Sequence, residues 1–279
     1  MPLDNESAER ERKIELAFAG LVSIALVALT AAVMRFSPAN ETVDSPTTLS
    51  GPIAVFPDFA SISDTEVKKQ QFFDFLQDYV RFENSRVTES RLQLLGYVDL
   101  VDGDGALSAP EKSWLLEMAS LYEVEAQDLS DRALVNELLE RVDVIPASLV
   151  LAQAANESAW GTSRFALEGN NLFGQWCYEE GCGIIPNRRV EGATHEVKAF
   201  DSIEDAIAGY FLNINTHHLY EDFRVERARL RQQGRRLDSI ALVQGLESYS
   251  QRGERYIDEV QTLIQQNDLR QRDRRWLDN

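Results

Sequence analysis

The stretch that decides the fold, residues 147–174, reads ASLVLAQAANESAWGTSRFALEGNNLFG. Its portion 149–157, LVLAQAANE, is mostly apolar, which predicts a buried helix that ends at Glu157. Trp160 and Gly161 follow closely, in a segment with the composition of a turn. A carboxyl group at the end of a buried helix beside a tryptophan loses hydration of its charged form, so its pKa is expected to rise.

Glu157 is therefore the candidate general acid. Most lone glutamates at such positions cap backbone groups or form ion pairs, and those roles do not need apolar surroundings. Protonation of a glycosidic oxygen, by contrast, needs a carboxyl group that keeps its proton near neutral pH. The apolar helix and Trp160 favour this second role.

Helical patterns lie on both sides of this stretch. Ser63 and Glu66 predict a capping box at the start of an amphipathic helix, and Ser202 is predicted to cap another. Further helices are expected at 86–97, 109–123, 130–142, 221–232, 238–247 and 253–267.

Between Gly169 and Phe200 the pattern changes to glycine-rich turns and short extended pieces, which predict hairpins and loops. The predicted fold class is therefore α+β and mostly helical, a helical body with a small β-lobe. The lobe holds both cysteines of the chain, Cys177 and Cys182, which are expected to form a disulfide in an oxidising compartment. A zinc site would need more ligands than this pair provides, so no metal site and no cofactor are predicted.

The N-terminus carries a candidate membrane anchor. Leu16 to Met34 contain no charged residue, and nineteen residues of helix span about 28 Å, close to the hydrocarbon thickness of a bilayer. Three basic residues precede the run and only Arg35 closely follows it, so the chain is predicted to cross a membrane once, with its N-terminus in the cytoplasm and its body outside. A cleaved signal peptide is the alternative, since residues 30–32 are small, but the run is longer than a usual signal core.

The distribution of charged residues argues against nucleic acid as a partner but does not exclude a calcium site. A formal net charge of −18 argues against nucleic acid, because phosphate binding draws on clustered Lys and Arg. Residues 100–111 partly match a calcium loop through Asp102, Asp104 and Glu111, although Leu100 stands where a carboxylate is expected. Ser108 and Glu111 also predict a capping box, which explains half of the match without an ion.

Several separated motifs occur together in this chain: NESAWGTSRFALEGNNLFGQWC, GCGIIP, HEVKAF and YSQRGERY. Over residues 64–269 the chain resembles the glucosaminidase family of peptidoglycan hydrolases, some of whose descriptions carry mannosyl-glycoprotein endo-N-acetylglucosaminidase or amidase labels. The resemblance implies a lysozyme-like helical body with a β-lobe, and cleavage of glycan strands of peptidoglycan after N-acetylglucosamine. Together with the apolar run and the Pro-, Ser- and Thr-rich stretch that follows it, the resemblance divides the chain into five predicted segments. These are 1–36, the cytoplasmic N-terminus and transmembrane anchor; 37–62, a linker; 63–143, a helical N-terminal region; 144–269, the glucosaminidase catalytic domain; and 270–279, a tail.

The same resemblance implies the site residues. The general acid falls on Glu157, and a second carboxylate in the β-lobe falls on Glu196 or Glu191, with Glu196 preferred because a strand position gives it a defined direction. Tyr249 matches a tyrosine that faces the cleft in the family. From residue chemistry, the candidates for sugar stacking or acetamido recognition are Trp160, Asn171, Phe173, Trp176 and Tyr210.

Two other readings remain open. A lytic transglycosylase also uses one glutamate in a lysozyme-like body, and a non-catalytic wall-binding protein could keep the same fold. The course of the reaction is open as well, because a base-activated water or the N-acetyl group of the substrate could complete it.

Overall fold

The computed structural model describes residues 56–103, 105–127, 129–187, 189 and 192–273. The chain divides into two units, 1–45 and 46–279, and all of the described residues belong to the second. Within the described part of the chain, no helix combines the length and the apolar character needed to cross a membrane. The apolar run at 16–34 lies outside these residues, so the predicted anchor stays a prediction.

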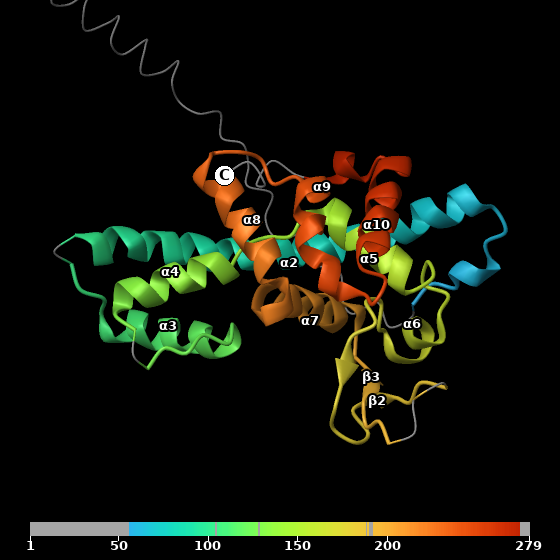
Figure 1. Ribbon diagram of the computed structural model, residues 1–279, viewed down its shortest axis with the longest axis horizontal. Helices are drawn as coiled ribbons and strands as arrows, with labels where there is room; N and C mark the ends of the chain where they lie inside the picture. Colours follow the sequence, from blue (N-terminus) through green and yellow to red (C-terminus); the bar gives the residue numbers. More distant parts are fainter. Residues whose placement is uncertain (1–55, 104, 128, 188, 190–191, 274–279) are drawn as a thin grey trace, which may run out of the picture. The chain divides into compact units, whose positions relative to one another are not determined.

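The described part of the chain is mostly helical with one small sheet, as predicted (Figure 1). The α-helices are α2 (Thr65–Asp102), α3 (Ala109–Leu121), α4 (Asp131–Arg141), α5 (Ala147–Glu157), α6 (Arg164–Gly169), α7 (Ile203–Thr216), α8 (Glu221–Gln232), α9 (Ser239–Leu242) and α10 (Glu254–Gln266). The 3-10 helices are η1 (Phe59–Ser61), η2 (His218–Tyr220), η3 (Val243–Tyr249) and η4 (Leu269–Arg272). The strands are β1 (Trp176–Cys177), β2 (Gly183–Ile184) and β3 (Glu196–Lys198).

Helix α2 differs from the prediction in its start and its length. Its N-cap is Asp64 rather than Ser63, and the Asp64 carboxylate accepts hydrogen bonds from the amides of Glu66 and Val67 at 2.9 and 3.0 Å. The helix then runs unbroken for 38 residues through the segment expected to form a separate helix at 86–97. A polar residue, Asn84, interrupts the apolar pattern of this helix. It is nevertheless buried, because its side chain forms two hydrogen bonds with the backbone of Ile145.

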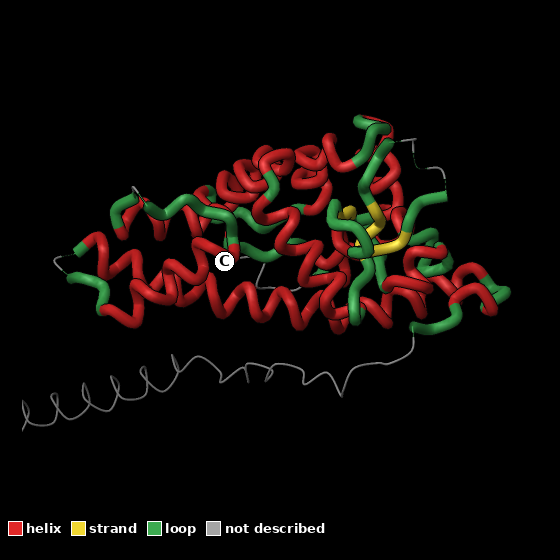
Figure 2. The backbone as a smooth tube through the Cα atoms, turned by 90° about the horizontal axis from the view of Figure 1, so that it is seen from below, coloured by secondary structure: helices red, strands yellow, loops and turns green. Residues whose placement is uncertain are grey.

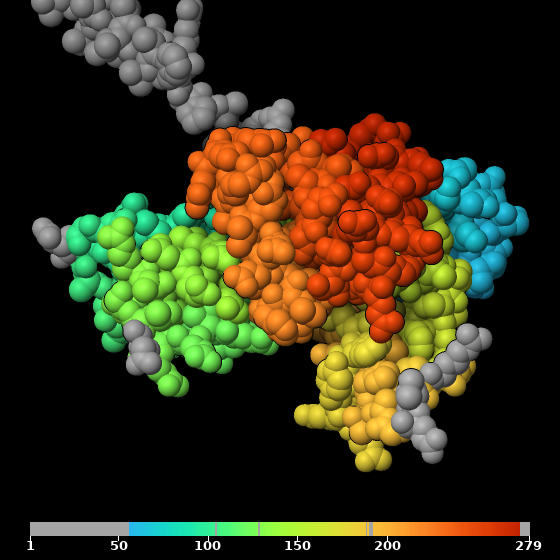
Figure 3. All heavy atoms as spheres, in the orientation of Figure 1, coloured from blue at the N-terminus to red at the C-terminus, as the bar shows by residue number. Residues whose placement is uncertain are grey.

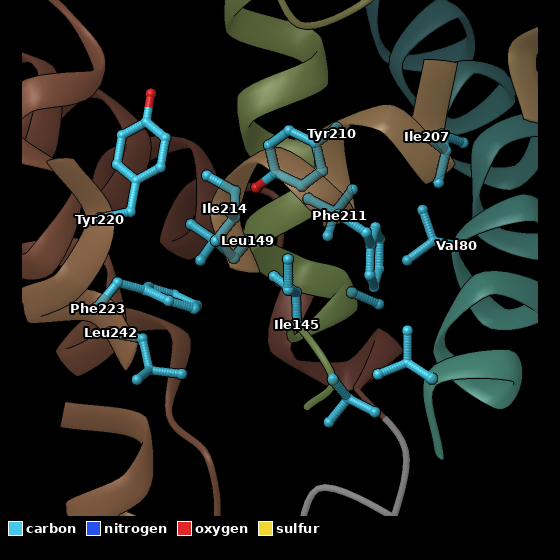
Figure 4. Close-up of a cluster of buried hydrophobic side chains, with 14 of the residues drawn as sticks. Val80, Ile145, Leu149, Ile207, Tyr210, Phe211, Ile214, Tyr220, Phe223 and Leu242 are labelled. Carbon is cyan, nitrogen blue, oxygen red and sulfur yellow. The ribbon is translucent and has the colours of Figure 1, made fainter. Parts of the chain in front are cut away.

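Helix α5 lies at the centre of the core. Its residues from Ala147 to Ala155 are all buried, and it packs against α2 and α10. Figure 4 shows the core beside it, where Leu149 of α5 meets Tyr210 and Ile214 of α7. Because α2 joins the same core, the predicted segments 63–143 and 144–269 share one hydrophobic interior.

The segment that leads into α5 is anchored by a buried carboxylate. Asp143 is 2% exposed and lies against Arg231 at 2.8 Å, Arg91 at 3.4 Å and Arg227 at 3.9 Å. Arg227 also donates hydrogen bonds to the carbonyl groups at the end of α4 and to those of Asp143 and Val144. This cluster fixes where the chain leaves α4 and therefore where α5 begins.

The β-lobe has the strand order β1-β3-β2, with both pairs antiparallel. Seen from below, the three strands lie together in front of the helices (Figure 2), and the lobe projects at the lower edge of the space-filling view (Figure 3). The predicted disulfide between Cys177 and Cys182 is present, with the two Cα atoms 6.2 Å apart. It closes the loop between β1 and β2.

The last residues of the predicted linker pack against the turn that follows α5. Phe56 and Phe59 form edge contacts with each other at 5.4 Å between ring centroids. Both rings lie against Gly161, where an added Cβ would come within 2.8 Å of each. Gly161 also has a φ of +73°, so this position favours glycine on both grounds.

Candidate active site

Glu157 is the last residue of α5, and the turn after it is tightly held. The buried Ser158 hydroxyl donates to the carbonyl of Ala154 at 2.6 Å and accepts from the amide of Gly161 at 2.8 Å. Ala159 and Trp160 both have positive φ values, 50° and 60°, which non-glycine residues adopt at an energetic cost. The turn thus fixes the backbone beside the Glu157 carboxyl.

The two carboxyl oxygens of Glu157 have different surroundings. Oε1 accepts a hydrogen bond from Asn156 Nδ2 at 3.2 Å and lies 3.7 Å from Arg252 Nη2. Oε2 faces Gly174, where an added Cβ would lie 3.8 Å away. Gly174 has a φ of +65° and no side chain, so it leaves the space beside Oε2 open.

Burial raises the pKa of Glu157 above its ordinary value, and this effect outweighs the opposing ones. The positive charge of Arg252 and hydrogen bonds from Asn156 and Tyr256 lower the pKa, whereas the negative charge of Glu259 raises it. Arg252 pairs with two carboxylates, because its Nη2 atom lies 3.7 Å from Glu157 Oε1 and its Nη1 atom binds Glu259 at 2.5 Å. The Glu157 side chain remains 21% exposed, so it is buried enough for an elevated pKa and still accessible.

Removing the charge of Arg252 and removing the charge of Glu259 should shift the pH dependence of activity in opposite directions. A general acid works in its protonated form, so the rate falls as the pH rises through its pKa. We expect Arg252→Gln to move this basic limb of the kcat–pH profile to higher pH, because a positive charge near Glu157 is lost. We expect Glu259→Gln to move it to lower pH, because a negative charge is lost and Arg252 is released toward Glu157.

The matched control is Arg229→Gln, which removes an exposed arginine paired with Glu226 on α8. Its pH profile should coincide with that of the wild type. Shifts of Arg252→Gln and Glu259→Gln in the same direction would contradict the charge argument.

Three buried side chains extend inward from Glu157. The Tyr256 hydroxyl lowers the pKa of Glu157, and it accepts a hydrogen bond from Gln153 Nε2 at 2.7 Å. Gln153 Oε1 in turn accepts from the Tyr210 hydroxyl at 2.5 Å. Sequence reasoning missed Gln153, Tyr256 and Arg252, although the spacing of four residues between Gln153 and Glu157 places both on one face of α5.

Four of the predicted substrate-binding residues have internal partners. Asn171 is buried and uses its whole side-chain amide on backbone groups of Phe173, Gln175 and Lys198. Phe173 stacks on Tyr210 with ring centroids 4.1 Å apart, and both rings are buried. Trp160 is partly buried and packs edge-on against Phe72 and Phe73. These contacts favour structural roles, and a sugar-binding role for these residues stays a prediction.

Trp176 differs from this group because it is exposed on β1. Its ring stacks on His195 with centroids 4.3 Å apart and an interplanar angle of 10°. Trp176 therefore has a rigid support and an exposed ring, as a sugar-stacking residue requires.

The second carboxylate stays a prediction. Both oxygens of Glu196 accept backbone hydrogen bonds, Oε1 from Gly181 at 3.2 Å and Oε2 from Gly183 at 2.8 Å. Glu196 is also buried on β3 opposite Cys177, so its contacts favour a role in holding the disulfide-bonded loop. Glu191 lies outside the described residues.

Tyr249 lies near the site with its hydroxyl directed at the protein. It donates to the carbonyl of Phe173 at 2.8 Å, and its ring stacks on that of Tyr256 at 5.5 Å. Burial raises the pKa of Tyr249 well above its ordinary value, so the hydroxyl keeps its proton. The predicted catalytic role of Tyr249 is untested, and these contacts connect the GNNLFG loop to the start of α10.

A groove of about 410 Å³ lies between α5, the turn that follows it and α10, and Glu157 itself does not line it. Two of its lining residues connect it to Glu157. Asn156 donates a hydrogen bond to Glu157, and Glu259 pairs with Arg252, which also contacts Glu157. The lining combines apolar side chains with charged ones of both signs: Ala155, Asn156, Ala159, Trp160, Arg255, Asp258, Glu259, Thr262 and Leu263. Such a groove suits a ligand with an apolar face and polar edges.

The calcium-like loop has internal partners for two of its carboxylates. Glu111 accepts a hydrogen bond from the amide of Ser108 at 2.6 Å, which confirms the predicted capping interaction. Asp102 pairs with Arg132 at 3.1 Å. Asp104 lies outside the described residues, and the described ones contain no cluster of His, Cys, Asp and Glu suited to a metal ion.

Comparison with known proteins gives two matches and one negative result. Residues 132–269 match the family described as Glucosaminidase: Mannosyl-glycoprotein endo-beta-N-acetylglucosaminidase. The chain is 32% identical to Protein bax of Escherichia coli (strain K12) over 211 residues, which cover 76% of this chain and 74% of that protein. No solved structure matches the chain significantly.

Proposed function

Since this chain belongs to the glucosaminidase family, we propose that it is a peptidoglycan hydrolase that cleaves the glycosidic bond after N-acetylglucosamine, with Glu157 as the general acid. The observation that supports this most is the setting of Glu157. It ends a buried helix, its pKa is raised by burial, and Oε2 faces the open side of Gly174. A carboxyl group in this state can give a proton to the leaving oxygen of a glycoside.

We also propose that the enzyme is held in the inner membrane by residues 16–34, with the hydrolase unit in the periplasm. The disulfide between Cys177 and Cys182 supports this location, because disulfides persist in oxidising compartments. Peptidoglycan glycan strands, the proposed substrate, are present on that side of the membrane.

The products distinguish hydrolysis from transglycosylation. We expect digestion of purified peptidoglycan by the full-length protein to release fragments with reducing N-acetylglucosamine ends. Borohydride reduction followed by mass spectrometry should then show N-acetylglucosaminitol at the new ends. Anhydro-muramic ends would instead establish the lytic transglycosylase reaction, and the absence of any new end would favour the non-catalytic alternative.

A further inference from the structure

The turn that follows Glu157 has an unfavourable backbone conformation. Ala159, Trp160 and Gly161 have φ values of 50°, 60° and 73°, so three consecutive residues lie in the left-handed region. Only glycine adopts this region without cost, and other residues keep it where the surrounding structure compensates. The hydroxyl of Ser158 holds the start of the turn, so the contacts made by its later residues decide whether it keeps this shape.

Trp160 is held from one side by α2. Its ring packs edge-on against Phe72 and Phe73, with ring centroids 5.9 and 5.2 Å apart, and the ammonium group of Lys69 lies 5.7 Å from its ring centroid. These contacts fix the Trp160 side chain. They do not cover Gly161, which has no side chain of its own to pack.

Gly161 is covered by two residues of the predicted linker, Phe56 and Phe59, which we call the linker aromatics. A Cβ added to Gly161 would lie 2.8 Å from Phe56 Cζ and 2.8 Å from Phe59 Cδ2, so both rings rest directly on the backbone of the turn. Phe59 also packs edge-on against Phe72 at 5.4 Å. The linker aromatics therefore connect this turn to α2.

The linker aromatics are themselves fixed in position. Phe59 is 1% exposed, and it begins η1, two of whose amides donate to the Asp58 carboxylate at 3.1 and 3.3 Å. Phe56 packs edge-on against Phe59 and also against Phe75 of α2 at 5.6 Å. A flexible tether needs neither a buried phenylalanine nor a capped helical turn, so residues 56–61 belong to the folded unit.

This close packing gives the linker aromatics an effect on Glu157. Folded interiors have few voids, so removal of a ring leaves a cavity into which the adjacent backbone can relax. The amide of Gly161, which faces the rings, donates to the hydroxyl of Ser158, the residue next to Glu157. A shift of Gly161 is therefore transmitted to the end of α5.

We propose that the linker aromatics are positioning residues of the active site: they cover Gly161 and so hold the turn that keeps the Glu157 carboxyl beside Gly174. This inference rests on the proposed function for its effect on catalysis. Its effect on the surroundings of Glu157 is a property of the folded protein and is measurable without turnover.

The experiment uses Phe59→Ala in the full-length chain and begins with the Glu157 carboxyl. Glutamate labelled with ¹³C at the side-chain carboxyl is titrated by NMR, and the Glu157 signal is assigned by its loss in Glu157→Gln. Burial raises the pKa of Glu157 in the wild type, so a turn that relaxes and admits water should move this pKa back toward its ordinary value. Phe56→Ala, at a partly buried ring, should shift it in the same direction with a smaller loss of stability.

Activity is then measured on peptidoglycan at a temperature at which each variant is folded. We expect Phe59→Ala to lower kcat by a factor of about 10 to 100, since a displacement of about 1 Å in a reacting group can cost about 10² in rate. The basic limb of the kcat–pH profile should move to lower pH, together with the pKa of the acid. Phe59→Leu should restore most of the wild-type kcat, because leucine refills much of the cavity.

The matched control is Leu94→Ala, at a fully buried leucine of α2. Leu94 lies about 30 Å along the helix from Phe73, at about 1.5 Å per residue. The control therefore loses comparable stability far from the turn. It should keep the wild-type kcat and the wild-type Glu157 titration.

A Phe59→Ala protein with the wild-type Glu157 titration, or with a kcat equal to that of Leu94→Ala, overturns the proposal. If Phe59→Ala does not fold, Phe56→Ala is judged by the same two criteria. If the wild type does not cleave peptidoglycan while Phe59→Ala lowers the pKa of Glu157, the proposed function is refuted and the positioning of the carboxyl by the linker aromatics is retained.

Discussion

Glu157→Gln is expected to lower kcat on peptidoglycan by about a thousandfold, within the range of about 10²–10⁴ that general acid–base catalysis contributes. Glutamine has the shape of glutamic acid, and its carbonyl oxygen can still accept from Asn156. It has no acidic proton to give to the leaving oxygen. The loss should therefore fall on kcat, while binding of the glycan strand is retained.

The measurement is the initial rate at which purified peptidoglycan is solubilised, together with a sedimentation assay for binding to the insoluble wall. The matched control is Glu168→Gln on α6, which makes the same substitution at an exposed glutamate close in sequence, 3.8 Å from Arg164. The control should keep wild-type rates. If Glu157→Gln solubilises peptidoglycan as fast as the control, Glu157 is not the general acid and another group supplies the proton.

The sequence was sufficient for those features of the fold that local patterns determine. The helix that ends at Glu157 was predicted from the mostly apolar stretch 149–157, and the Cys177–Cys182 bond from two cysteines in a short loop. The continuous α2 was not predictable in the same way. Its polar segment is held by Asn84, whose partner Ile145 lies 61 positions away in the sequence.

In the candidate site, too, the sequence did not reveal which partners the side chains have. Asn171, Phe173 and Tyr210 are of residue types that often bind sugars, yet their atoms are used inside the protein. Residue type does not reveal whether a partner comes from the substrate or from the backbone. Arg252 was missed for a related reason, because its position between Glu157 and Glu259 follows only from the packing of α10 against α5.

The second large effect concerns stability and the position of α5. Asp143→Asn is expected to lower the free energy of unfolding by about 3–5 kcal/mol, the cost of removing one member of a buried ion pair. Arg227 is fully buried, and although burial lowers its pKa to about 10, it stays charged at neutral pH. Without the Asp143 carboxylate, the charges of Arg91, Arg227 and Arg231 are left facing one another in the interior.

The pH dependence of unfolding provides an independent check on that carboxylate. Burial alone would raise the pKa of Asp143, but the three arginines together hold it below its ordinary value. A group with a lowered folded-state pKa contributes stability above its unfolded pKa and loses it as the pH falls toward the folded value. Urea unfolding of the wild type should therefore show stability that decreases under acidic conditions, and Asp143→Asn should lack this component.

The control Asp131→Asn, which breaks a half-exposed pair with Lys112 at 2.8 Å, should cost less than about 1 kcal/mol. Equal costs for the two variants would contradict a role for Asp143 as the anchor of α5, since an anchor must be worth more than a surface pair.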